Sequence, residues 1–117
     1  MEVQAIMKNV RMSPQKMREV VRQIQGLPAE QAQAILAVVP RKGARLVAKT
    51  LKSAMANAED LKEHKKEYAG LQTDQLLIKH AEAQKASIVK RFTPKARGSA
   101  GPILKRNCHI KIVLSDE

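Results

Sequence analysis

Apolar residues recur with helical spacing in the first half of the chain and with strand spacing in the second half. Between positions 14 and 58 they follow the i, i+3, i+4, i+7 pattern of an amphipathic helix in three successive segments. Residues 3–11 and much of the chain after Leu76 instead alternate between apolar and polar positions, which is typical of strands. The pattern therefore predicts one strand, three helices, and then further strands.

The first helix has the clearest predicted boundaries, because Ser13 suits an N-cap, Pro14 the first helical position and Gly26 a stop. A second helix is predicted between Pro28 and Pro40, and a third from 41 to about 60. Their apolar stripes are Met17, Val20, Val21 and Ile24, then Ala32, Ile35, Leu36 and Val39, and finally Ala44, Val47, Ala48, Leu51, Ala54, Met55 and Ala58.

Residues 60–75 are charged and polar with neither period, which predicts a helix end followed by an exposed loop. Residues 85–93 and 103–114 predict two strands of a hairpin around a turn-like segment at 94–102. Each strand of about 11 residues spans roughly 36 Å, whereas a compact chain of this length has a radius of gyration of about 13 Å. We therefore expect a single domain over 1–117, from which an extended hairpin at 83–115 projects.

The charge of the chain is concentrated in this hairpin. The formal net charge is +11 and the pI about 10.2, which favours a polyanionic partner. Residues 83–115 contain no Asp or Glu but eight cations: Lys85, Lys90, Arg91, Lys95, Arg97, Lys105, Arg106 and Lys111. An isolated hairpin of this kind is only marginally stable in water, so we expect an external partner to neutralise it.

Several chemistries are disfavoured by the residues present. The single cysteine, Cys108, excludes a disulfide framework and a multi-cysteine zinc site, and its place on an alternating strand predicts a packing role. His64, His80 and His109 have no ligand partners at metal-site spacing, and no phosphate loop or nucleophile elbow is present. We expect no enzyme activity, no metal and no cofactor. Without a long apolar run or a secretory signal pattern, the cytoplasm is the expected location.

Two further basic clusters lie outside the hairpin. Lys8, Arg11, Lys16 and Arg18 surround Ser13, where the N–H groups of a helix start can hold a phosphate; the alternative is a simple N-cap with scattered surface charge. The third helix carries a basic stripe that either binds phosphate or only aids solubility, formed by Lys42, Arg45, Lys49 and Lys52.

Tyr68 and Phe92 are the only aromatic residues, too few for the stacking platforms of common single-strand binders. Recognition through phosphates and the shape of a folded RNA is therefore expected, while Phe92 is either a packing residue or an exposed contact. One rival is a DNA-binding architectural protein that inserts the hairpin into a groove. A membrane-surface protein is a weaker rival, because the predicted helices lack Trp and Phe on their apolar faces.

Several segments resemble the family of large-subunit ribosomal protein number twenty-two, whose extended hairpin lines the nascent-chain exit tunnel. The similar segments are residues 10–18, 53–58, 90–91, 94–98 and 103–106, together with His109 and Ile110. The chain departs from the family pattern at Ala86 and Ser87, where a Gly-Pro pair is expected, and also at Gly101, Pro102 and Cys108.

The resemblance implies an α+β fold with three helices on a small three-stranded antiparallel sheet. It also implies a structural component of the large subunit that supports assembly and contacts ribosomal RNA, neighbouring ribosomal proteins and the nascent polypeptide, with no membrane contact and no stable homo-oligomer. The residues then expected to bind ribosomal RNA are Lys8, Arg11, Ser13, Lys16, Arg18, Lys42, Lys49, Lys90, Arg91, Lys95, Arg97, Gly98, Lys105, Arg106, His109 and Lys111. Those expected to line the tunnel at the hairpin tip are Lys90, Arg91, Phe92, Thr93, Pro94 and Lys95.

Overall fold

The computed structural model describes residues 2–116, and within them the chain forms three α-helices and three β-strands. In order these are β1 (Glu2–Val10), α1 (Pro14–Val21), α2 (Ala29–Val38), α3 (Lys42–His64), β2 (Leu77–Pro94) and β3 (Ala100–Ser115). Short 3-10 turns lie at Lys66–Tyr68, Thr73–Gln75 and Ala96–Gly98. This order confirms the predicted α+β class.

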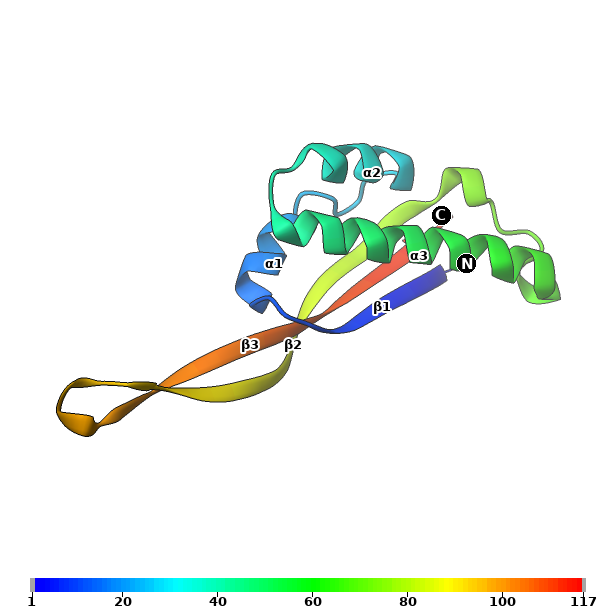
Figure 1. The fold of residues 1–117 in the computed structure, drawn as a ribbon. Helices are drawn as coiled ribbons and strands as arrows, with labels where there is room; N and C mark the ends of the chain where they lie inside the picture. Colours follow the sequence, from blue (N-terminus) through cyan, green and yellow to red (C-terminus); the bar gives the residue numbers. More distant parts are fainter. Residues whose placement is uncertain (1, 117) are drawn as a thin grey trace.

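The strands form one antiparallel sheet in the order β1-β3-β2, which places the C-terminal strand at the centre. Ile112 of β3, for example, pairs with Ala5 on one side and with Ala81 on the other. The helices lie over one face of this sheet, and β2 and β3 continue beyond it as a two-stranded arm (Figure 1). The arm is therefore a direct extension of the strands that form the core.

The core lies between the sheet and the helices and is almost entirely aliphatic. The predicted alternation in β3 is confirmed, since its inward side chains are all fully buried: Cys108, Ile110, Ile112 and Leu114. The predicted stripe of α3 is likewise buried at Ala44, Val47, Leu51, Ala54 and Ala58. Small alanine side chains allow the helix to approach the sheet closely, so no aromatic residue is needed to fill the space.

Helix α1 ends earlier than the apolar spacing predicts. The prediction extended to Gly26, but the regular helix stops at Val21 and the next residues form tighter turns, in which the Ile24 N–H donates to the Val21 carbonyl at 3.3 Å. Gly26, with φ of +74°, then donates its N–H to the Ile78 carbonyl at 3.0 Å. Ile24 is nevertheless fully buried. The spacing thus predicted burial correctly, while docking of this segment onto β2 changed its local conformation.

Helix α3 is longer, and the segment after it less exposed, than predicted. The helix was expected to end near Asp60 but continues to His64, whose Nδ1 lies 3.2 Å from the Asp60 carboxylate one turn earlier. Beyond it Leu71 is buried and Tyr68 packs against the core. The prediction of an exposed loop was therefore wrong at these two residues, because this segment folds against the core before it enters β2.

The turn of the arm is shorter than predicted. Pro94 pairs with Ala100 and Phe92 with Pro102, so the prolines belong to the strands and the turn comprises only residues 95–99. A two-stranded ribbon tolerates proline because each strand has an edge that needs no N–H donor. The molecule measures 67 × 28 × 16 Å with a radius of gyration of 17.7 Å. This value exceeds the roughly 13 Å of a compact chain, as expected for a projecting arm.

Candidate nucleic-acid interface

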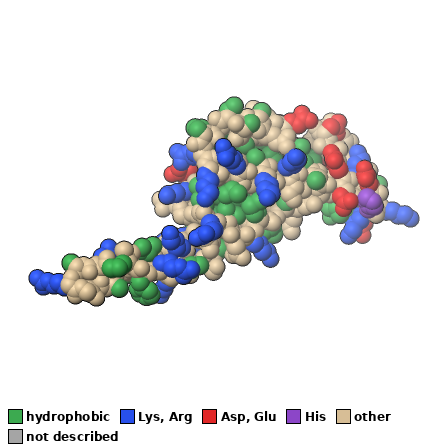
Figure 2. All heavy atoms as spheres, in the orientation of Figure 1, with side chains coloured by type: hydrophobic (Ala, Val, Ile, Leu, Met, Phe, Trp, Pro, Cys, Tyr) green, Lys and Arg blue, Asp and Glu red, His purple; other side chains and the backbone are tan. Residues whose placement is uncertain are grey.

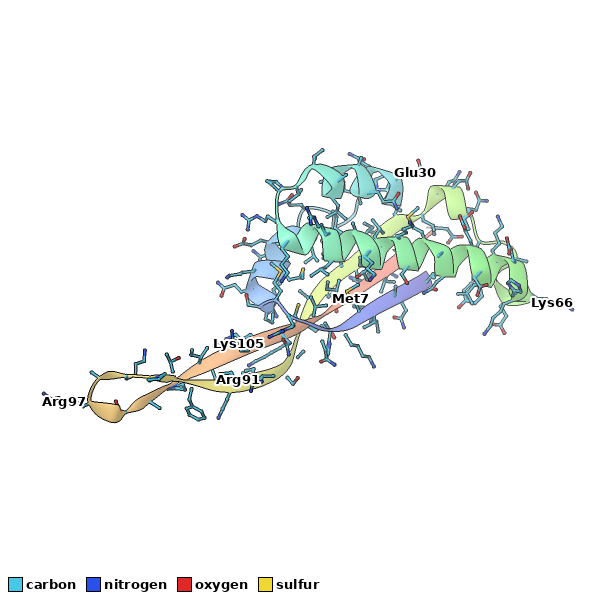
Figure 3. The ribbon with its side chains drawn as sticks, viewed as in Figure 1. Met7, Glu30, Lys66, Arg91, Arg97 and Lys105 are labelled. Carbon is cyan, nitrogen blue, oxygen red and sulfur yellow. The ribbon has the colours of Figure 1, made fainter. Side chains whose placement is uncertain are left out.

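The arm beyond the globule consists of residues 84–107, and none of its residues is buried. It contains no acidic residue and exposes its cations on all sides; Figure 2 shows Lys and Arg side chains along its length. Figure 3 places Arg91 and Lys105 along the arm and Arg97 at its end. The positive charge predicted from the sequence is thus displayed on a slender projection.

The pairing of the two strands separates like charges. We define the outer stem as residues 88–94 and 100–106. Its first four pairs each join one cation to one aliphatic residue: Ile88 with Arg106, Val89 with Lys105, Lys90 with Leu104 and Arg91 with Ile103. Like charges directly opposite one another destabilise a sheet, whereas long basic side chains can lay their stems over aliphatic neighbours. This register therefore allows the two strands to pair although the hairpin contains no Asp or Glu.

Both faces of the outer stem are basic. Directly paired residues share a face, and faces alternate along each strand. The face that we call the Phe92 face carries Ile88, Lys90, Phe92, Pro102, Leu104 and Arg106. The opposite Thr93 face carries Val89, Arg91, Thr93, Gly101, Ile103 and Lys105. Each face has two cations, so a polyanion can contact the stem from either side.

The turn is closed by local hydrogen bonds and two residues of left-handed conformation. The Lys95 N–H donates to the Ser99 carbonyl at 2.6 Å, and the Ser99 hydroxyl donates to the Ala96 carbonyl at 2.9 Å. Arg97 and Gly98 have φ of +61° and +72°. Glycine adopts this conformation without strain, and Arg97 is held at the apex of the arm, beyond both strands (Figure 3).

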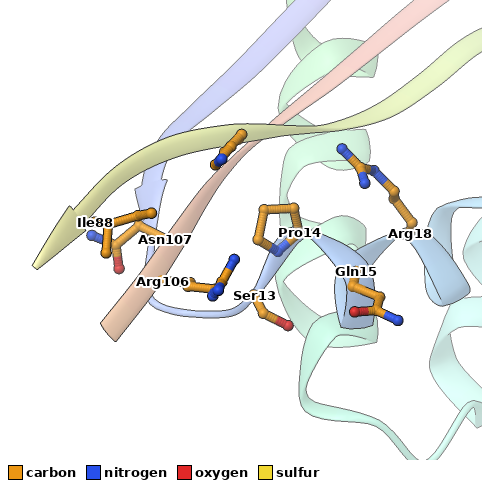
Figure 4. Close-up of a pocket in the computed structure, with 8 residues that line it drawn as sticks. Ser13, Pro14, Gln15, Arg18, Ile88, Arg106 and Asn107 are labelled. Carbon is orange, nitrogen blue, oxygen red and sulfur yellow. The ribbon is translucent and has the colours of Figure 1, made fainter. Parts of the chain in front are cut away.

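A half-open hollow of about 550 Å³ lies where the arm leaves the globule (Figure 4). We call it the root hollow; its walls are Ser13, Pro14, Gln15, Arg18, Lys85, Ile88, Arg106 and Asn107. Three cations reach it from three elements, Arg18 from α1, Lys85 from β2 and Arg106 from β3. None of the lining residues is acidic, so the hollow can accommodate a phosphate group.

Side chains near the hollow are positioned by bonds to the backbone. Ser13 caps α1 as predicted, because its hydroxyl accepts a hydrogen bond from the Lys16 N–H at 3.3 Å. Arg18 Nε donates to the Ala83 carbonyl at 3.2 Å, and the Gln25 side chain bonds both the N–H and the carbonyl of Ala81. Arg18 and Gln25 thus bind the open edge of β2 through hydrogen bonds and hold the root of the arm in place.

The structure brings together only part of the predicted RNA-binding set. Ser13, Arg18 and Arg106 meet in the root hollow, while the exposed Lys8, Arg11 and Lys16 surround the nearby strand-to-helix junction. Sequence reasoning omitted Gln15, Lys85 and Asn107 from this set. Lys85 and Asn107 carried only a weak signal, their place in the acid-free segment, because their position beside α1 depends on long-range packing.

Two predicted residues lie elsewhere on the sheet. His109 Nδ1 accepts a hydrogen bond from the Asn9 N–H at 3.0 Å, which orients the ring at the irregular end of β1. Lys111 is half-buried on the sheet face away from the helices, between Ile6 of β1 and Glu82 of β2. Lys111 therefore belongs to a different surface from the root hollow.

The basic stripe of α3 is exposed and begins at the helix N-terminus. Lys42, Arg45, Lys49 and Lys52 all face solvent, and the first turn contains no acidic residue. Cations near a helix N-terminus oppose the helix dipole, so a bound anion is favourable there. Arg41, just before the helix, forms an ion pair with Glu19 of α1. Lys42 and Lys49 thus remain candidates for phosphate contacts.

Acidic side chains gather at the end of the molecule remote from the arm (Figure 2). The last turns of α3 and the following 3-10 turn contribute Glu59, Asp60, Glu63 and Glu67, all exposed. The charge is therefore polarised along the long axis, with the arm and the root hollow at the basic end.

Other chemistry has little support in the part of the chain that the structure describes. Burial raises the pKa of the Cys108 thiol, an effect that nearby Arg18 partly opposes, which disfavours a thiolate there. Residues 2–116 contain no group of three or more His, Cys, Asp and Glu side chains placed to hold a metal ion. The helices within that range are all too short or too polar to cross a membrane.

Comparison with known proteins gives one consistent result. The family described as Ribosomal protein L22p/L17e matches residues 5–115. The large ribosomal subunit protein uL22 of Opitutus terrae is 49% identical over 116 residues, covering 99% of this chain and 96% of that protein. The uL22 proteins of Akkermansia muciniphila and Finegoldia magna are 45% and 41% identical, covering 100% and 99% of this chain and 98% and 97% of their own lengths.

Proposed function

The chain belongs to the ribosomal protein L22p/L17e family, and from this premise we propose that its arm is enclosed by ribosomal RNA and ends at the nascent-chain exit tunnel. The protein is a structural, non-enzymatic component of the large ribosomal subunit that binds ribosomal RNA. In bacteria it is located in the cytoplasmic ribosome. Its partners are ribosomal RNA and other proteins of the large subunit.

The observation that carries the proposal is the presence of cations on both faces of the outer stem. A hairpin that only lay on an RNA surface would need cations on one face. Here Lys90 and Arg106 occupy one face and Arg91 and Lys105 the other. This arrangement fits a stem with phosphates on both sides. Family membership favours RNA over the rival DNA-groove interpretation, which had rested on the same basic hairpin.

We propose that the predicted RNA-binding residues act as four groups. The root hollow and its surroundings supply Lys8, Arg11, Ser13, Lys16 and Arg18, together with Lys85, which the sequence prediction omitted. The N-terminal half of α3 supplies Lys42 and Lys49, and the sheet supplies His109 and Lys111. The arm supplies Lys90, Arg91, Lys95, Arg97, Gly98, Lys105 and Arg106.

The tunnel-lining tip is proposed to be the end of the outer stem and the turn. Residues 90–94 alternate between the two faces, so not all of them can border one space. Arg97 and Gly98 at the apex extend farther than any of them. Contact with the nascent polypeptide is therefore expected from Thr93, Lys95 and the turn, and the protein is expected to act as one copy without a stable homo-oligomer.

The proposal is tested by the salt dependence of binding to large-subunit ribosomal RNA. Replacing Lys105 and Arg106 by Ala should weaken binding and flatten the plot of log affinity against log salt by about one unit per lost phosphate contact. A matched control removes two exposed cations at the acidic end, Lys62→Ala with Lys66→Ala, and should keep the wild-type slope. Equal slopes for the two double variants would contradict the assignment. Competition with duplex DNA should displace little of the RNA.

A further inference from the structure

We propose that Phe92 stacks on an unpaired base of ribosomal RNA, so that the Phe92 face of the outer stem is applied to RNA while the end of the Thr93 face borders aqueous space. This inference rests on the proposed function and names the chemical group that this part of the arm contacts. It also adds a contact with a base to an interface otherwise built from cations.

Phe92 is not a packing residue. The residue is 72% exposed, compared with 36% for Ile88 and 43% for Leu104 on the same face. The residue opposite is Pro102, which presents a small apolar ring and no polar group. A large apolar side chain held this far out in water is typical of a contact surface that a partner covers.

The Phe92 face continues into the root hollow. β3 keeps a regular alternation from Cys108 through Arg106 and Leu104 to Pro102, so these side chains share one side of the strand. Ile88 and Arg106 line the hollow, and Phe92 follows four residues beyond Ile88, roughly 13 Å along the strand. An RNA strand that places a phosphate in the hollow therefore has a direct route past Lys90 to the ring.

The apolar area around Phe92 suits a base better than a protein. Lys90 and Arg106 interrupt it, so this face lacks the continuous apolar centre that is typical of a stable protein interface. A base needs only one flat aromatic face, and stacking does not require a donor or an acceptor on the protein. Because residues 83–115 contain no acidic residue, the chain nearest to this ring is expected to be a polyanion.

The other face ends in small and polar groups. Thr93 lies opposite Gly101, and the stem of Lys95 folds back over that glycine so closely that an added Cβ would lie 2.5 Å from Lys95 Cε. The Thr93 hydroxyl oxygen is itself buried and has no hydrogen-bond partner, so the end of this face presents a glycine backbone and the Lys95 ammonium group, and it has no large apolar side chain to keep from water. An exposed backbone and an ammonium group suit the wall of a water-filled passage. The ring of Phe92, on the other face of the stem, suits contact with RNA.

The first test measures the affinity of the full-length protein for bacterial large-subunit ribosomal RNA over a series of salt concentrations. Phe92→Leu keeps an apolar side chain but removes the aromatic face, and should weaken binding by about 5- to 150-fold at every salt concentration with an unchanged slope. Phe92→Tyr should restore most of the affinity. Lys90→Ala should show the opposite signature, a shallower slope. Equal affinities for wild type and Phe92→Leu would overturn the stacking contact, whereas failure of the wild type to bind would overturn the proposed function.

The second test uses the absence of tryptophan from the chain. Phe92→Trp introduces a single indole, whose emission should fall when ribosomal RNA is added, and fall further than that of Ile103→Trp on the opposite face. In assembled subunits the indole at position 92 should be shielded from acrylamide. Free access of acrylamide to this indole, or a change of its emission only when a nascent chain is present, would overturn the inference and place the ring on the tunnel side.

Discussion

At the residue scale, Ser13 shows how one side chain serves both stability and binding. Its hydroxyl accepts the Lys16 N–H, and the same residue lines the root hollow beside Arg106. The cap was predictable, because Ser before Pro at a helix start is a local signal. The hollow was not predictable, because it forms only when α1 packs beside β2 and β3, which lie far later in the chain.

Two substitutions separate these roles. Ser13→Ala should lower the free energy of unfolding by about 1 kcal/mol, because the Lys16 N–H loses its acceptor. Ser13→Asp retains the cap and suits the helix dipole, so stability should stay within about 0.5 kcal/mol of wild type. The carboxylate would, however, repel phosphate from the hollow and weaken RNA binding about tenfold.

Urea unfolding followed by far-ultraviolet circular dichroism measures the first effect, and filter binding to ribosomal RNA measures the second. Ser53→Asp, on the exposed surface of α3, is the control for a change in net charge. If Ser13→Asp and Ser53→Asp bound RNA equally well, the root hollow would not be a phosphate site.

At the element scale, local patterns predicted the helices, the strands and the hairpin, but not the end of every helix or the exact register of the strands. The stripe of α3 and the alternation of β3 were readable because most side chains in them are buried by a regular partner surface. The end of α1 and the burial of Leu71 depend on contacts with distant strands, so no local signal marked them. The pairing of each cation with an aliphatic residue was also hidden, because it depends on the length of the turn.

The register predicts how charge at Leu104 controls order in the arm. Leu104→Glu places a carboxylate directly opposite Lys90, and Leu104→Lys places a second ammonium there. A cross-strand charge pair is worth about 0.2 to 1 kcal/mol, so hydrogen exchange of the outer-stem amides in the free protein should slow by about 1.4- to 5-fold for Glu and accelerate similarly for Lys. Leu104→Gln is the neutral control. Identical exchange in the Glu and Lys variants would show that these strands do not pair in this register.

At the scale of the whole molecule, the fold divides into a globule that holds the buried core and an arm that holds the exposed charge. Residues 84–107 contribute no buried residue, and the acidic residues of α3 lie at the opposite end. The composition predicted that the cationic hairpin needs a partner. The length of the two hairpin strands predicted that the arm projects from the globule. The direction of the arm relative to the helices could not be predicted, because it depends on irregularities in strand pairing.

This division predicts that the globule folds without the arm. Replacing residues 86–107 by Asn-Gly would connect Lys85 and Cys108, which already pair, through a two-residue turn. The midpoint of thermal unfolding should stay within about 5 °C of wild type, because no core side chain is removed, while binding to ribosomal RNA should fall steeply. A variant that failed to fold would show that the arm and the globule form one cooperative unit.

The bulge at the root gives this shape a mechanical consequence. Lys85 pairs with Cys108 and Ile88 with Arg106, so β2 contains one extra residue at Ala86 and Ser87, and such insertions bend a strand. The arm acts as a lever about this point. A change of about 10° there, multiplied along roughly 36 Å of strand, would carry Arg97 sideways by about 6 Å. Insertion or deletion of one residue at Ala86 and Ser87 would therefore displace the tip by a larger distance than any exchange of side chains at the tip itself.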